Sequence, residues 1–265
     1  MSALQERVEH RKDVLTRPPL QPVTTENSPE IVLECGRLVA ERYLRKGFIG
    51  PDDIDDDGRI SRDADPDRDN SHYFFHVDEA TGEIVATTRQ IYIPEGAEPA
   101  EWQFPLERDF DLMPDAQSLI EAIKVAEPRA VVEISGLAKK NGQNFAAVLS
   151  LYRESWQFSR YAGHKVCVMR SERGLTENLQ AMFGEGIIRA GERKRYEGGV
   201  SDPMLLFPDR CAGAMADNYR RLVEEKGEEA AEGYLDLVRF FLEDMDTSFL
   251  SDEEVAELTD IGALR

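Results

Sequence analysis

The sequence lacks a long hydrophobic run, a paired-cysteine motif and an apolar leader. Nowhere do 18 apolar residues stand together, so we predict no membrane span. Cys35, Cys167 and Cys211 are widely spaced and form no C-x-x-C pair. This spacing offers no zinc signature and favours a reducing, cytoplasmic location over a disulfide framework. The charged N-terminus has no apolar core, so we also predict no signal peptide.

The sequence is also poor in positive charge. Its net charge of −20 over 265 residues argues against a nucleic-acid-binding protein, because phosphate recognition needs a basic face. The charge is unevenly distributed, however. Residues 139–197 contain eleven Lys and Arg against six Asp and Glu, whereas residues 209–265 contain six against sixteen. A locally basic middle is compatible with a phosphate-bearing ligand.

Hydrophobic periodicity predicts helices and strands in turn, and then helices only. Helices are expected at 30–46, 117–124, 145–161, 175–182, 210–225, 228–243 and 252–258, and strands at 72–77, 84–92, 130–138, 165–169, 187–196 and 204–207. This order predicts an α+β fold with a mixed central sheet flanked by helices. We expect a polar N-terminal arm at 1–28, one main domain at 29–208 and an acidic helical extension at 209–265. Domain closure or homodimer formation is the expected role of the extension.

A loop at residues 50–70 contains nine aspartates. Residues 53–57 partly follow the spacing of a calcium-binding loop, but the glutamate that an EF-hand requires does not follow. We therefore predict a solvated loop and no metal site.

The most informative stretch is Ala130–Lys140, with the sequence AVVEISGLAKK. Its β-branched residues predict a buried central strand, yet Glu133 lies inside it. A buried carboxylate needs a partner, a water-filled cleft or a raised pKa. Glu133 is therefore either a catalytic base or a member of a buried ion pair with Arg89 or Arg129. The basic turn after this strand precedes a helix, which is the setting of an anion cradle.

Several motifs occur together in an order that is typical of one family. They are Tyr43–Phe48 (YLRKGF), Asp69–His72 (DNSH), Val85–Arg89, Phe104–Phe110 (FPLERDF), Val132–Ala138 (VEISGLA) and the helix and strand that follow as far as Val168. Over residues 30–208 the chain resembles the N-acyl amino acid synthases and acyl-homoserine lactone synthases of the GNAT superfamily. The resemblance implies a GNAT-like (acyl-CoA N-acyltransferase) fold and the transfer of a fatty acyl group to an amine.

The resemblance also implies roles for individual residues. Glu133 would hold or deprotonate the acceptor amine. The acceptor site would be built from Arg89, Asp69 (or Asp67 in a shifted alignment), Ser71, His72 and Ser135. The pantetheine arm of the donor would lie along Leu137, Ala138, Lys139, Lys140 and Gly142. No permanently bound cofactor is implied, because acyl-CoA or the acyl-phosphopantetheine of an acyl carrier protein would serve as co-substrate.

The residues themselves leave simpler interpretations open. Arg89 ends a strand and could pair only with a loop aspartate, and Ser71 could cap the turn before its strand. Cys167, with no histidine predicted beside it, is expected to pack in the core.

The chain departs from the family pattern at Gly136, where an arginine is usual, and in the first helix, where an arginine of the autoinducer synthases has no clear counterpart. These departures favour an acceptor other than the one that gives a homoserine lactone. They also support an alternative, a catalytically inactive GNAT-like ligand-binding or scaffold protein. An acidic carrier protein would have to dock on the basic residues Arg153, Arg160, Lys165 and Arg193–Arg195.

Overall fold

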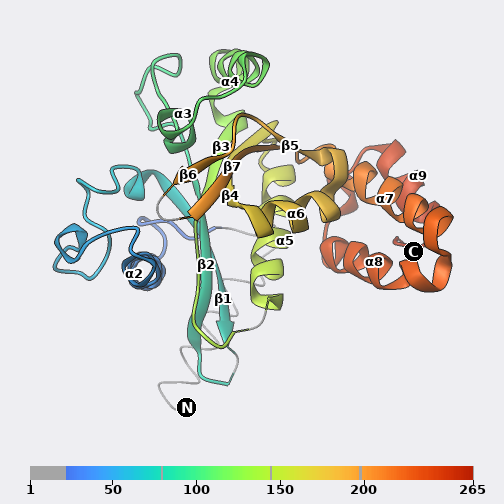
Figure 1. The fold of residues 1–265 in the computed structure, drawn as a ribbon, viewed down its shortest axis with the longest axis horizontal. Helices are drawn as coiled ribbons and strands as arrows, with labels where there is room; N and C mark the ends of the chain where they lie inside the picture. Colours follow the sequence, from blue (N-terminus) through green and yellow to red (C-terminus); the bar gives the residue numbers. More distant parts are fainter. Residues whose placement is uncertain (1–21, 79, 144, 197–198, 265) are drawn as a thin grey trace. The chain divides into compact units, whose positions relative to one another are not determined.

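A computed structural model describes residues 22–78, 80–143, 145–196 and 199–264. These residues form a seven-stranded sheet with flanking helices, which confirms the predicted α+β fold (Figure 1). The chain divides into two compact units. Unit 1 comprises the described residues up to Pro105 together with Val132–Phe158 and Arg195–Gly199, and unit 2 comprises Leu106–Val131, Ser159–Lys194 and the described residues from Val200 onward.

Unit 1 is a layered arrangement of helices and antiparallel strands. Its elements are α2 (Pro29–Lys46), η1 (Pro51–Asp53), η2 (Arg68–Asn70), β1 (Ser71–Asp78), β2 (Glu83–Ile91), most of β3 (Val131–Lys139) and most of α5 (Ala146–Tyr161). The three strands follow the order β1-β2-β3. Helix α2 covers one face of them and α5 the other (Figure 1).

The sequence of helix α2 contains the features that begin the helix, end it and bury one of its faces. Pro29 occupies the first turn, where its missing N–H costs nothing, and Gly47 ends the helix with φ of 73°. The residues Ile31, Cys35 and Leu38 recur at helical spacing and are buried against the strands.

Unit 2 contains the remaining elements. They are α3 (Pro105–Asp109), α4 (Pro114–Ala126), η3 (Pro128–Ala130), β4 (Val166–Glu172), α6 (Arg173–Phe183), η4 (Gly184–Gly186), β5 (Ile187–Arg189), β7 (Gly199–Leu206), α7 (Cys211–Lys226), α8 (Glu228–Leu242), η5 (Thr247–Phe249) and α9 (Asp252–Asp260). Strand β7 pairs antiparallel with β4 and with β5. The short β6 (Lys194–Tyr196) falls at the boundary between the units.

One predicted strand, 187–196, is wrong as a continuous element, because the chain forms β5 and β6 with an interruption between them. The interruption contains Gly191, which forms an isolated bridge with Leu112. A Cβ atom at Gly191 would lie only 2.5 Å from the Asp111 carbonyl oxygen. Glycine is therefore needed for this close approach of two backbones, and the strand breaks there.

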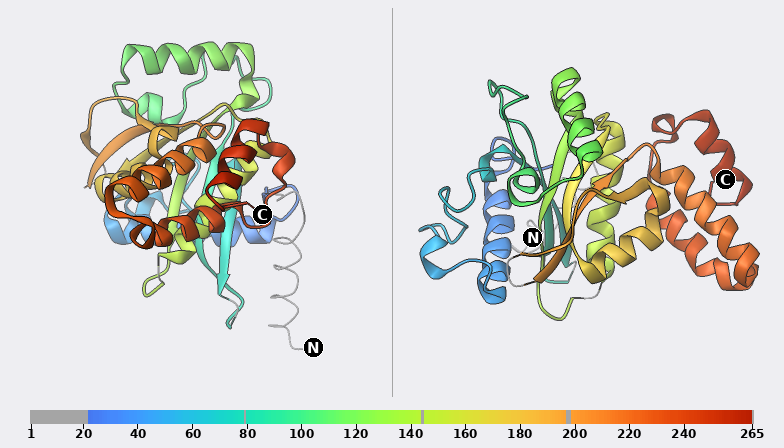
Figure 2. Two further views of the ribbon diagram at one scale, coloured as in Figure 1. Left: turned by 90° about the vertical axis from the view of Figure 1, so that its right-hand side faces the viewer. Right: turned by 45° about the horizontal axis from the view of Figure 1, so that its top comes forward.

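The C-terminal helices pack against α6 within unit 2 (Figures 1 and 2). The Tyr234 hydroxyl donates to the Met182 carbonyl at 2.6 Å, and the rings of Phe183 and Phe241 meet edge to face with centroids 5.2 Å apart. Through these contacts an apolar side of α8, in the acidic C-terminal extension, packs on α6. None of the described helices is long and apolar enough to cross a membrane.

The predicted N-terminal arm lies mostly outside the described residues. At its end, Val23 is 1% exposed and exchanges backbone hydrogen bonds with Tyr73 of β1. The last part of the predicted arm therefore belongs to unit 1.

Glu154 on α5 makes the stability of the fold dependent on pH. Burial raises its pKa to about 8, against the opposing effect of Arg153. Between the ordinary value of 4.5 and about 8, the folded chain keeps a proton that the unfolded chain has lost, so stability falls as pH rises. Replacing Glu154 with glutamine is expected to raise the free energy of unfolding by a few kcal/mol at pH 8 and little at pH 5. Urea unfolding at both pH values measures this, and equal gains would contradict it.

Candidate functional site

Glu133 lies on β3 and its side chain is fully buried. The strand register places Arg89 opposite Ser135 and Ile91 opposite both Glu133 and Ser71. Directly opposed residues of antiparallel strands share a face, so Ser71, Arg89, Glu133 and Ser135 all lie on the face that α2 covers. The register thus places four of the predicted site residues on one face of the three strands.

A bulge follows at Gly136. The register between β2 and β3 shifts between Thr87 and Arg89, and Gly136 has φ of 64°, in the left-handed region. The shift changes the alternation of side chains, so that Leu137 packs with the α5 face and Ala138 with the α2 face. A Cβ atom at Gly136 would lie 3.4 Å from Cγ and Nε of Arg89. Glycine is favoured here by the left-handed backbone, and an added Cβ would lie in contact with the Arg89 side chain.

Replacing Gly136 with alanine is therefore expected to destabilise the protein by about 1–2 kcal/mol, because an L-residue in the left-handed conformation is strained. Gly174 provides a matched control, since it lies in α6 with nothing within 4 Å of an added Cβ. Alanine there is expected to be neutral or stabilising. Denaturant unfolding of both variants measures the difference, and equal effects would contradict the role assigned to the bulge.

Arg89 pairs with Asp65 of the aspartate loop. Its two terminal nitrogens donate to the two carboxylate oxygens at 2.7 and 2.8 Å, a bidentate arrangement. Burial alone would lower the pKa of Arg89, but Asp65 and Tyr73 raise it above its ordinary value. Arg89 therefore remains charged in the interior, and the simpler expectation of an ion pair with a loop aspartate is confirmed.

A small pocket opens beside this pair, in unit 1. It is lined by Gly36, Val39, Arg59, Ile60, Asp65, Arg68, Tyr73 and Arg89. Its free space is about that of one water molecule. The lining carries three arginines and one aspartate, which is unusual in a chain with a net charge of −20.

The sequence predicted a solvated aspartate loop. This prediction is wrong for part of the loop. Asp67 is 1% exposed, and Asp55 accepts hydrogen bonds from the Arg68 side chain at 2.5 Å and from the backbone N–H of Arg59 at 2.9 Å. Burial alone would raise the pKa of Asp55, but these contacts lower it. Among the described residues, no group of three His, Cys, Asp or Glu side chains could hold a metal ion. The loop instead supplies partners for arginines.

Asp69, which the resemblance placed in the acceptor site, pairs with Arg62. Its carboxylate accepts from Nε of Arg62 at 2.6 Å, with both side chains open to solvent. The aspartate that does meet Arg89 is Asp65.

The strand register places Ser71 and His72 on opposite faces of the strands. The Ser71 hydroxyl donates to the Asp67 carbonyl at 2.8 Å, which is the turn-capping contact expected as its simpler role. His72 lies opposite Gln90, on the α5 face, where its ring packs against Tyr92 with centroids 4.2 Å apart. Burial lowers the pKa of His72 to about 4. His72 therefore lies on the other face of the strands from Glu133.

The residues predicted to hold pantetheine form the end of β3 and the turn after it. Lys139 donates to the Gln143 carbonyl at 2.7 Å, and Lys140 pairs with Glu83 at 2.7 Å near the surface. Gly142 has φ of 83° and no neighbour within 4 Å of an added Cβ, so the turn is open at this point. A phosphate at this turn would compete with these internal contacts.

The basic residues predicted to dock a carrier protein are largely engaged within unit 2. Arg160 is buried, pairs with Glu254 at 2.7 Å and donates to the Phe249 carbonyl. Arg193 makes a bidentate contact with Asp202, and Lys165 pairs with Glu127. Arg160 is therefore not available at the surface, whereas Lys165 and Arg193 keep 52% and 31% of their side chains exposed beside their carboxylate partners, so docking of a carrier protein on them stays a prediction.

Cys167 is buried, and its thiol lies 3.5 Å from the Ser159 hydroxyl. Burial raises its pKa to about 12, so it remains a thiol at neutral pH. The expectation that it packs in the core is confirmed.

Sequence patterns did not single out four residues of the pocket: Gly36, Arg59, Asp65 and Arg68. Asp65 is one of nine aspartates in its loop, and their spacing does not distinguish it. Gly36 offered a usable pattern, because an isolated glycine within a helix often has a packing reason.

With this geometry in place, the chain can be compared with known proteins. TofI, in a ternary complex with an inhibitor and MTA, superposes with a TM-score of 0.50 at 18% identity over 70% of this chain and 89% of TofI. The AHL synthase LasI gives 0.50 at 14% identity, over 70% and 87% of the two chains. BjaI, a CoA-dependent acyl-homoserine lactone synthase with SAM and isopentyl-CoA, gives 0.50 at 16% identity, over 76% and 87%.

These likenesses show that the chain has the fold of the acyl-homoserine lactone synthases. The resemblance inferred from the sequence motifs is thereby confirmed at the level of the fold. No protein-family model matches the chain, and neither does any curated protein sequence.

Proposed function

We propose that this protein is an N-acyltransferase, which moves a fatty acyl group from a thioester to the amine of an amino acid or a related small molecule. The observation that carries the proposal is the fully buried Glu133, on the same strand face as the Arg89–Asp65 pair, in a chain with the fold of acyl-transferring synthases.

The proposed reaction forms an amide and releases a thiol. The amine nitrogen attacks the thioester carbonyl carbon, the new C–N bond forms, and the C–S bond breaks. Glu133 takes the proton that the amine loses, and the departing thiolate ends as the free thiol. A base within hydrogen-bond reach and a rigid strand that positions both reactants supply most of the rate enhancement.

We propose acyl-CoA as the donor in preference to an acyl carrier protein. The basic residues that a carrier would need are mostly paired, as described for Arg160, Arg193 and Lys165. BjaI, which shares the fold, is described as CoA-dependent. We place the pantetheine arm along Leu137–Lys140, beside the open turn at Gly142.

Incubation of the purified protein with acyl-CoA thioesters and a mixture of amino acids, followed by mass spectrometry of the products, tests the proposal. N-acyl amino acids are the expected products, and the same incubation with acylated carrier protein compares the two donors. If neither donor gives an amide while the protein carries a tightly bound lipid, a ligand-binding protein with this fold replaces the proposal.

A further inference from the structure

Helix α4 in unit 2 has one face in the interior and one face in solvent. The inner face carries Ala116, Ile120 and Lys124, which recur at four-residue spacing and are buried. The Lys124 ammonium is paired there with Glu107 at 3.0 Å. The opposite face is exposed and consists of Asp115, Ser118, Leu119, Ala122, Val125 and Ala126. We call this set of residues the outer face of α4.

The outer face is apolar over the last two turns of α4, although it is open to solvent. Leu119 and Val125 are 36% and 65% exposed, and the neighbouring alanines add no polar side chain. Residues 118–126 contain two charged side chains, Glu121 and the buried Lys124. Glu121 lies beside the outer face, where it accepts a hydrogen bond from Gln117 at 2.8 Å. A contiguous exposed apolar face of this kind is typical of an interaction surface.

The outer face is complementary to itself about Ala122. Leu119 precedes Ala122 by three residues and Val125 follows it by three, while Ser118 and Ala126 stand four residues before and after it. When two such helices pack antiparallel and cross at Ala122, each residue meets the one at the same distance on the other side. Leu119 then meets Val125 of the second copy. The small side chains of Ser118, Ala122 and Ala126 let the two backbones approach closely.

The charges at the two ends of α4 favour the same arrangement. Asp115 is exposed in the first turn, and Arg129 is exposed in η3, which follows α4 after Glu127 and contacts it. Antiparallel packing brings the first turn of one copy to the last turn of the other, so Asp115 and Arg129 attract each other at both ends of the contact. Parallel packing would bring like charges together instead.

A lipid surface fits the outer face less well than a second copy does. A helix that lies on a membrane combines bulky apolar residues with lysine and arginine on its polar side. The exposed acidic residues Asp115 and Glu121 border the outer face instead, and α4 contains neither Phe nor Trp.

We propose that the outer face of α4 binds the same face of a second copy of this chain, with the two helices antiparallel about a two-fold axis at Ala122. The proposal does not depend on the proposed acyl transfer. It assigns the contact of a homodimer to α4 and not to the acidic C-terminal extension.

Sedimentation of the full chain tests the proposal. At about 0.15 M salt, the long-range repulsion between two chains of net charge −20 is screened. A single pair of helix faces is smaller than a standard interface, so an equilibrium between one and two chains is expected between about 5 and 500 μM. Ala122→Glu places two carboxylates at the axis and is expected to leave only monomer, and glutamate keeps α4 helical. Ala230→Glu, at an exposed position of α8, is the matched control and is expected to keep the wild-type equilibrium.

Exchanging the two charges tests the antiparallel orientation. Asp115→Arg and Arg129→Asp each place like charges at both ends of the contact, so each is expected to weaken the dimer about five- to tenfold. The double variant Asp115→Arg/Arg129→Asp is expected to restore the wild-type equilibrium. A double variant as weak as the single variants would contradict the antiparallel arrangement.

Cross-linking tests the position of the axis. With a mild oxidant, which takes two hydrogens from two thiols, Ala122→Cys is expected to give a disulfide-linked dimer and Ala230→Cys is not. The native Cys35, Cys167 and Cys211 are buried and do not compete. Equal cross-linking of the two variants would overturn the proposal. A dimer that persists in Ala122→Glu would also overturn it, because the contact would then lie elsewhere.

A wild-type protein that sediments as one chain at every concentration would overturn the proposal. Vesicles of phosphatidylcholine then test the other occupant. If the monomeric wild type cosediments with these vesicles and Ala122→Glu does not, the outer face binds a lipid surface and not a second copy.

Discussion

Replacing Glu133 with glutamine is expected to lower kcat for amide formation by about 10²- to 10⁴-fold, which is the usual contribution of a positioned general base. Glutamine has nearly the same shape, so the buried strand is retained, but its amide cannot accept a proton from the attacking amine. The measurement is the initial rate of amide formation from acyl-CoA and an amino acid acceptor, with the fold checked by circular dichroism.

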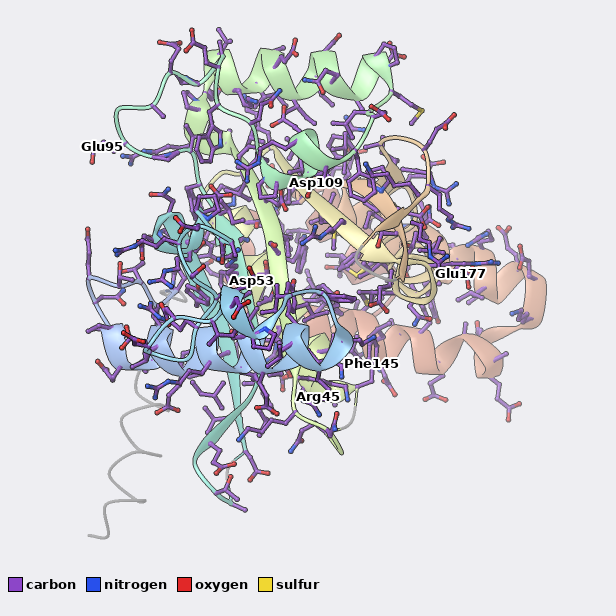
Figure 3. All side chains as sticks on the ribbon, turned by 60° about the vertical axis from the view of Figure 1, so that its left-hand side comes forward. Arg45, Asp53, Glu95, Asp109, Phe145 and Glu177 are labelled. Carbon is purple, nitrogen blue, oxygen red and sulfur yellow. The ribbon has the colours of Figure 1, made fainter. Side chains whose placement is uncertain are left out.

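Glu177→Gln is the matched control for this variant. Glu177 is an exposed carboxylate on α6 (Figure 3) that pairs with Arg173 one turn away, and its loss is expected to leave the rate unchanged. A folded Glu133→Gln protein with a near-normal rate would remove Glu133 from the mechanism. A folded, inactive Glu177→Gln protein would show that the loss is not specific.

Replacing Lys124 with methionine is expected to lower the free energy of unfolding by about 3–5 kcal/mol. The Lys124 ammonium lies 3.0 Å from each carboxylate oxygen of Glu107, and the two side chains are only 2% and 1% exposed. Methionine fills similar space without a charge, so the buried carboxylate of Glu107 would lose the Lys124 ammonium. Urea unfolding of the variant measures the loss.

The double variant Lys124→Met/Glu107→Leu provides the control for this pair. It removes both charges and replaces them with apolar groups of similar size, so most of the lost stability is expected to return. If the double variant is less stable than Lys124→Met, the residues contribute independently and the interpretation as a coupled pair is wrong.

The periodicity of the apolar residues was sufficient to predict most of the helices and strands. The strands around Phe74 and Val132 and the helix beginning near Ala146 have apolar residues at periods that only one element satisfies. The break at Gly191 was not predictable in this way, because its cause is the backbone of a segment about 80 residues earlier, at Asp111 and Leu112. Alternating residues on both sides of the break had the pattern of one continuous strand.

The candidate site was only partly predictable. Glu133 was identified because a carboxylate in a buried strand conflicts with its surroundings. The partner of Arg89 was not identified, since choosing Asp65 from nine aspartates requires the path of the loop over the strands. The position of His72 on the opposite face follows from register alone, and register is fixed by the pairing of whole strands.

The structure gives Gly136 a different interpretation from the one that the sequence suggested. In the sequence it was an arginine missing from a family pattern, and it supported an inactive relative. In the structure its left-handed backbone forms the bulge that shifts the register, and Arg89 lies over it. The departure therefore has a reason in the backbone geometry of this bulge.

Acyl transfer to an amine is tested most directly by measuring both products of one incubation. The protein is mixed with acyl-CoA and an amino acid acceptor, and free CoA thiol and N-acyl amino acid are quantified over time. The prediction is that the two form in a one-to-one ratio, and that both rates fall together in Glu133→Gln. Release of thiol without amide, or no release of either product, would contradict the proposed function.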